Sequence, residues 1–164
     1  MTRAAAAGVL LLATAACWRN EHIAAPAATP RPVLGTAAVL ELDGAARAGR
    51  DLWVRVRVHR DAGRAPIGGV RGRVRFDPSL MQYGGEDHGH TSFAAVSDST
   101  GLVRFAGITT NGFPDGVVLR IRFRVLQSFE PGQLTLELDE LNDVNLLGLL
   151  GELTIMTPSI LVER

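Results

Sequence analysis

Lysine is absent from this chain of 164 residues: all 17 basic residues are arginine, and 17 acidic residues balance them. A formal net charge of zero argues against nucleic acid as a bulk partner, because binding to phosphates needs a basic excess. Together with the many alanines, the missing lysine is more typical of a codon bias than of a function. The balanced charge therefore excludes one class of partner and indicates no other.

Motifs typical of nucleophilic enzymes are also missing. The chain has no Gly-x-Ser-x-Gly motif and no glycine-rich loop of the kind that binds phosphates. Cys17 is the only cysteine, so an internal disulfide is excluded, and its place near the N-terminus leaves no plausible Cys–His pair. We therefore predict a protein that is not an enzyme.

No stretch shows a sustained hydrophobic period of 3.6 residues, whereas period-2 alternation recurs between turn residues. Residues 70–76 alternate apolar residues or glycine with arginine until Asp77-Pro78 ends the run, and residues 117–126 alternate in the same way. Residues 84–90 are predicted to form a glycine-rich polar loop, and residues 97–101 a turn. The pattern predicts one all-β domain of eight to ten strands, most simply a two-sheet sandwich.

The N-terminus has the features of an export signal. A basic start at residues 1–3 precedes an apolar run at 4–13 and small residues at 14–16. The run is too short to span a bilayer. Residues 17–36 are rich in alanine and proline, which predicts an extended tether. The predicted organisation is thus a signal peptide at 1–16, a tether at 17–36 and a β-sandwich domain at 37–164.

Cys17, directly after the small residues, resembles the lipobox cysteine of bacterial lipoproteins. The resemblance implies lipidation of Cys17, and Trp18 in place of an aspartate implies delivery to the outer membrane. Thr14 stands where that family prefers leucine, so ordinary signal-peptidase cleavage with a free thiol stays open as the alternative. We expect an exported protein that meets the membrane only through its lipid anchor.

The order of the strand motifs resembles that of a cohesin domain over roughly residues 37–163. Gly49 precedes a valine-rich strand, and residues 66–69 enter a strand that ends Phe-Asp-Pro-Ser-Leu at residues 76–80. Residues 101–106 and 115–125 resemble the paired strands of the family's second half, and residues 143–145 its loop before the last strand. The resemblance implies a jelly-roll sandwich of about nine strands, related to carbohydrate-binding modules. Its function would be to bind a protein partner, which in cellulosomes is a calcium-loaded dockerin.

The family's strand order implies that the strands at residues 70–76 and 102–108 lie in the sheet whose outer face binds partners. The predicted partner-binding residues are therefore Arg71, Arg73, Arg75 and Arg104. Guanidinium groups suit the capture of carboxylates and are common at interface hot spots. The alternative is a solvated face whose arginines pair across strands with residues such as Glu137.

Two polar clusters contain residue types that bind metals, but neither spacing defines a geometry. We expect no resident cofactor, with calcium left open. The zinc candidates are Glu86, Asp87, His88 and His90; the calcium candidates are Asp139, Glu140, Asn142, Asp143 and Asn145.

The main functional prediction is a cell-envelope interaction module with a protein partner, for which a dockerin-like protein is the specific candidate. The first alternative is a carbohydrate-binding module with polysaccharide as its ligand. That function needs exposed aromatic platforms, for which only Trp53, Tyr83 and Phe113 are candidates. The second alternative is a structural envelope-assembly lipoprotein that uses the apolar residues 146–150 as a contact, although the same residues also suit a core.

Overall fold

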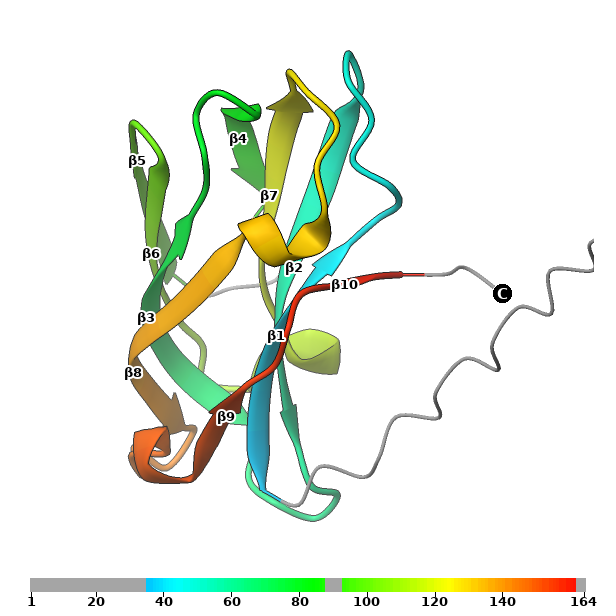
Figure 1. Ribbon diagram of the computed structural model, residues 1–164. Coiled ribbons are helices and arrows are strands. Elements are labelled where there is room, and N and C mark those ends of the chain that lie inside the picture. Colours follow the sequence, from blue (N-terminus) through cyan, green and yellow to red (C-terminus); the bar gives the residue numbers. More distant parts are fainter. Residues whose placement is uncertain (1–34, 88–92, 162–164) are drawn as a thin grey trace, which may run out of the picture. The chain divides into compact units, whose positions relative to one another are not determined.

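The computed structural model describes residues 35–87 and 93–161, and this part of the chain is a sandwich of two sheets (Figure 1). One sheet has the order β10-β1-β2-β7-β4, with β9 also paired to β1, and the other has the order β5-β6-β3-β8. The predicted all-β sandwich is therefore confirmed. The strands are β1 (Thr36–Leu42), β2 (Asp51–Arg60), β3 (Ile67–Arg75), β4 (Met81–Asp87), β5 (Phe93–Ser99), β6 (Leu102–Ile108), β7 (Val117–Val125), β8 (Thr135–Asp143), β9 (Leu153–Ile155) and β10 (Ser159–Ile160).

Three short 3₁₀ turns join some of these strands: η1 (Pro114–Gly116), η2 (Pro131–Gln133) and η3 (Leu150–Glu152). Within residues 35–87 and 93–161, no helix has the length and apolar character needed to cross a membrane. The predicted signal peptide and Cys17 lie outside the described residues.

The core lies between the two sheets and is built from the inward faces of the alternating strands. In β3, Val70 and Val74 are buried on the same side as Gly72, while the arginines between them face outward. In β7, Ile121 and Phe123 are buried, and this strand is an interior one between β2 and β4. Phe123 packs edge-on against Phe76, with ring centroids 5.1 Å apart, which links the two sheets.

Two connections predicted from the sequence are strands instead. Residues 84–87 belong to β4, which pairs with β7 through a register shift between Tyr83 and Gly85. Pairing with β7 satisfies the backbone of this glycine-rich segment, so partner contacts outweigh its weak local propensity. Residues 97–99 extend β5 along β6, so the predicted turn begins only at Thr100.

Candidate functional site

The outer face of the β5-β6-β3-β8 sheet brings the four predicted arginines together. Arg73 on β3 lies directly opposite Arg104 on β6 and, on its other side, opposite Glu137 on β8. Arg71 and Arg75 lie two residues to either side of Arg73, so period-2 alternation puts all three on the same face of β3. The structure thus confirms that the predicted set shares one surface.

The arginines of β3 are each paired with acidic side chains of β8. Arg75 Nε lies 2.6 Å from Glu137 Oε1, and Arg73 Nε lies 2.5 Å from Glu137 Oε2. Arg73 also contacts Asp139 at 3.3 Å, and Arg71 contacts Glu140 at 3.7 Å. This is the cross-strand pairing that the sequence left open as the alternative. Because these pairs are solvent-exposed, they contribute little to stability.

Arg104 differs from the other three arginines. Its side chain is exposed, and no hydrogen bond or ion pair joins it to another residue in the described part of the chain. The positive charge opposite the Arg73–Glu137 pair is therefore not balanced by a carboxylate of the described residues. A carboxylate of a partner can approach Arg104 without breaking an existing pair.

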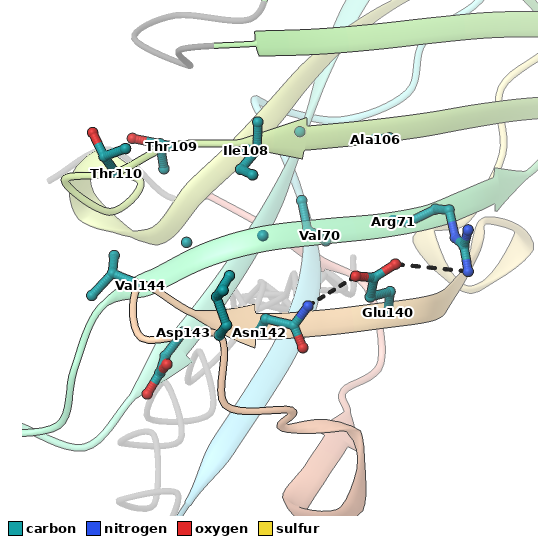
Figure 2. A pocket seen from close by; sticks show the side chains of 14 residues that line it. Val70, Arg71, Ala106, Ile108, Thr109, Thr110, Glu140, Asn142, Asp143 and Val144 are labelled. Atoms are coloured by element: carbon teal, nitrogen blue, oxygen red, sulfur yellow. Dashed lines mark hydrogen bonds and ion pairs between the residues drawn. The ribbon is translucent and has the colours of Figure 1, made fainter.

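A hollow of about 480 Å³ lies beside the ion pairs on the same sheet (Figure 2). At one end of the hollow are Arg71 and Glu140, and at the other are Thr109, Thr110 and Val144. The complete lining comprises Gly68, Gly69, Val70, Arg71, Ala106, Gly107, Ile108, Thr109, Thr110, Glu140, Asn142, Asp143, Val144 and Leu146.

Gly69 opens the hollow because it supplies no side chain in its row of the sheet. It lies in register between Ile108 of β6, which is 50% exposed, and Asn142 of β8. A Cβ atom built on Gly69 would meet only the Asn142 side chain, at an ordinary contact distance of 3.8 Å. The site therefore combines an open, partly apolar hollow with a charged surface. The sequence reasoning missed Gly69, Ile108 and Asn142; the Gly68-Gly69 pair inside a strand was the available signal.

Glu137 is the best-held carboxylate of the surface. Hydrogen bonds first from Arg75 and then from Arg73 lower the pKa of Glu137 below its ordinary value of 4.5, since they stabilise the ionised form. The stabilisation by Glu137 is therefore complete above pH 4.5 and is lost as the pH falls through the lowered pKa. An NMR titration of side-chain carboxyl groups should show this low pKa, and Arg75→Gln should raise it. An unchanged pKa in that variant would contradict the pairing.

The predicted calcium ligands do not converge on a common point. Asp139 and Glu140 contact arginines, and Asn142 Nδ2 donates to Glu140 Oε1 at 2.9 Å. Asp143 is buried and accepts backbone N–H groups, including that of Asn145 at 2.8 Å. Within residues 35–87 and 93–161, no group of three or more His, Cys, Asp or Glu side chains is placed to hold a metal ion. Of the zinc candidates, Glu86 and Asp87 lie on β4, whereas His88 and His90 lie outside the described residues.

The three aromatic candidates do not form a shared platform for a glycan. Phe113 is buried in the core, and Tyr83 packs against the core. Trp53 faces outward from β2, but the guanidinium carbons of Arg120 and Arg122 lie 5.0 and 5.9 Å from its ring centroid.

The arginines of β7 also engage their neighbours, as the sequence predicted for two of the three. Arg120 pairs with Asp87 at 3.4 Å, and Arg124 pairs with Asp51 at 3.3 Å. Arg122 instead donates hydrogen bonds to the carbonyl oxygen of Gly84.

No family model matches the chain, and no curated protein matches it. Solved structures do match. Cohesin CaCohA2 in complex with dockerin CaDoc0917 has a TM-score of 0.57 and 15% identity, covering 78% of this chain and 99% of that one. A non-cellulosomal cohesin from the archaeon Archaeoglobus fulgidus has a TM-score of 0.56 and 17% identity, covering 78% and 92%. CaCohA2 from Clostridium acetobutylicum in solution has a TM-score of 0.54 and 15% identity, covering 79% and 91%. At these identities the likeness shows the fold, and this chain has the cohesin fold that the order of its strand motifs implied.

Proposed function

We propose that this chain is a non-catalytic interaction module of the cell envelope that binds a protein partner through the outer face of the β5-β6-β3-β8 sheet. The observation that carries the proposal is the open hollow at Gly69 on the same face as the exposed Arg104. A second support is that CaCohA2, which has this fold, is seen in complex with CaDoc0917. A dockerin-like protein is the specific partner that we propose.

The geometry ranks the contributions of the face. An apolar side chain of the partner fits between Ile108 and Asn142, where Gly69 leaves room. A carboxylate of the partner reaches Arg104 at little cost, since no carboxylate of the described chain has to be displaced. The arginines of β3 would first have to leave their partners on β8. Arg104 therefore ranks first among the four predicted arginines.

Filling the hollow should abolish partner binding without unfolding the domain. Gly69→Leu places a side chain in open space, so we expect binding to weaken by about a hundredfold or more while the melting temperature is unchanged. The assay is capture from the native cell's envelope and secreted fractions with residues 17–164, with calcium and with a chelator, followed by calorimetry on the captured protein. Gly132→Leu is the matched control, because a Cβ atom there also meets nothing within 4 Å and η2 lies outside the face.

Arg104 is tested in the same assay. Arg104→Ala should weaken binding by about tenfold, whereas Arg124→Ala, on the other sheet, should leave it unchanged. Wild-type affinity in both Gly69→Leu and Arg104→Ala would exclude this face. A partner captured only with calcium supports a dockerin-like protein, and recovery of polysaccharide alone would favour the carbohydrate-binding alternative.

We also propose that the chain is exported and lipidated at Cys17, which would place the module at the outer membrane. The support is the order of basic, apolar and small residues before the single cysteine. Cells fed labelled palmitate should incorporate the label into the wild-type chain and not into Cys17→Ser. Label in neither chain, with the chain found free in the periplasm, would indicate ordinary signal-peptidase cleavage.

A further inference from the structure

The turn between β8 and η3 exposes three leucines, which contradicts the core prediction for most of residues 146–150. Leu146 is 77% exposed, Leu147 61% and Leu150 43%, and only Leu149 is buried. We call Leu146, Leu147 and Leu150 the leucine turn. Exposed apolar side chains that occur singly are ordinary, but three within five residues form a local patch that marks an interaction site.

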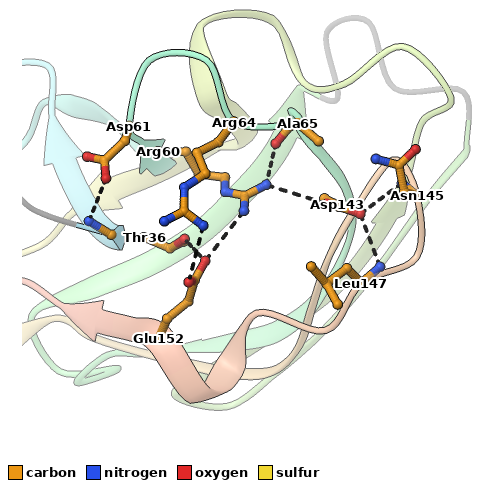
Figure 3. Close-up of polar contacts among 10 residues, drawn as sticks. Thr36, Arg60, Asp61, Arg64, Ala65, Asp143, Asn145, Leu147 and Glu152 are labelled. Atoms are coloured by element: carbon orange, nitrogen blue, oxygen red, sulfur yellow. Dashed lines mark hydrogen bonds and ion pairs between the residues drawn. The ribbon is translucent and has the colours of Figure 1, made fainter.

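The leucine turn is held by buried contacts rather than left loose (Figure 3). One carboxylate oxygen of Asp143, Oδ1, accepts the backbone N–H groups of Asn145 and Leu147, at 2.8 and 3.0 Å. The other, Oδ2, lies 3.7 Å from the Arg60 guanidinium. Leu146 adopts a φ of 65°, which is costly for a branched side chain and persists only when surrounding contacts impose it. The backbone therefore presents these leucines in a fixed arrangement.

The described chain begins at the same end of the sandwich. The N–H of Gly35 donates to Asp61 Oδ2 at 3.0 Å, and Thr36 Oγ1 donates to Glu152 Oε1 at 2.8 Å (Figure 3). Glu152 ends η3, the turn that begins with Leu150. The 34 preceding residues, which include Cys17, therefore join the domain beside the leucine turn.

We propose that the leucine turn docks on a phospholipid surface, with Leu146, Leu147 and Leu150 inserted among the lipids. The position at which the preceding chain joins the domain selects this occupant, because a tether lipidated at Cys17 would leave from the same end. The tether keeps the domain near the membrane, so even weak insertion by three side chains is effective. The contact adds to the lipid anchor and rests on the proposed export, but not on the proposed partner face.

The charges at this end predict the character of the contact. Arg60 contacts Asp143 and Glu152, at 3.7 and 3.4 Å, and Arg64 contacts Glu152 at 3.9 Å. These cations are already matched by carboxylates and offer little attraction to anionic headgroups. Docking should therefore be driven by apolar burial and depend only weakly on salt.

The test is binding to phosphatidylethanolamine and phosphatidylglycerol vesicles, measured by co-sedimentation. Residues 17–164 with Cys17→Ser carry neither the apolar leader nor an acyl chain, and they keep every core residue, all of which lie between Ala38 and Leu149. This chain should bind the vesicles, and Leu147→Ser with Leu150→Ser should weaken the binding by about tenfold or more. Leu126→Ser is the matched control, because Leu126 is 47% exposed and follows β7 at the opposite end of the sheet.

The two proposals can fail separately in these assays. Leu147 and Leu150 do not line the hollow, so the double variant should capture the protein partner normally. Gly69→Leu should bind vesicles normally. No vesicle binding by the parent chain, or equal binding by the double variant, would overturn lipid docking. Dimers in sedimentation that disappear in the double variant, without vesicle binding, would show a second copy as the occupant and would overturn it too.

Discussion

Gly72→Val should lower the free energy of unfolding by about 3 kcal/mol or more, because no room exists for a side chain at this position. A Cβ atom on Gly72 would lie 2.5 Å from the carbonyl oxygen of Glu137 and 2.7 Å from a methyl carbon of Leu138. The ring of Phe105 would be only 3.1 Å away on the same side. The carbonyl belongs to the backbone of β8, so it can move only if the β3–β8 ladder opens. Urea denaturation of the purified chain measures the loss.

Gly69→Val is the matched control, since Gly69 lies three residues earlier in the same strand and faces solvent. Its Cβ atom would meet only the Asn142 side chain at 3.8 Å, and valine suits a strand better than glycine. We expect this variant to be as stable as the wild type or slightly more stable. Equal denaturation midpoints for Gly72→Val and the wild type would mean that β3 and β8 do not approach this closely.

The close approach at Gly72 depends on a feature that the alternating pattern does not contain. The pairing of β3 with β8 shifts register between Arg71 and Gly72, so Asp139 has no direct partner on β3. This β-bulge adds a carboxylate beside Arg73, which contacts Asp139 at 3.3 Å. Period-2 alternation predicted the inward position of Gly72 and the outward positions of the arginines. It could not predict the bulge, because the bulge is a property of two strands that are far apart in sequence.

Similar limits apply to the other parts of the candidate site. The strand at residues 84–87 needs its partner β7 to be recognised, because its own residues have weak strand propensity. The leucine turn is apolar in composition, and the sequence therefore indicated a core. Asp143 decides otherwise, since its buried carboxylate fixes the turn so that Leu146 and Leu147 face solvent. Contacts between distant residues thus determined what composition alone could not.

Asp143→Ala should lower the free energy of unfolding by about 3–5 kcal/mol, because it leaves a buried charge and two buried donors without their acceptor. The Arg60 side chain is only 8% exposed, and its remaining partners are Glu152 and the carbonyl oxygen of Ala65. Asp143 Oδ1 also accepts the N–H groups of Asn145 and Leu147. Urea denaturation measures the loss, and hydrogen exchange at Leu147 should report the loosened turn. Unchanged exchange there would contradict a role for Asp143 in fixing the leucine turn.

Two further variants separate the charge from the hydrogen bonds. Asp143→Asn keeps an oxygen that can accept the N–H groups of Asn145 and Leu147, so it should restore slow exchange at Leu147 while it still destabilises the domain. Arg60→Met combined with Asp143→Asn removes the uncompensated charge as well and should recover most of the lost stability. If the double variant were no more stable than Asp143→Asn alone, the cost would lie in the turn and not in the buried guanidinium. Recovery would instead mean that Arg60 requires a carboxylate at position 143, while the turn requires only an oxygen there.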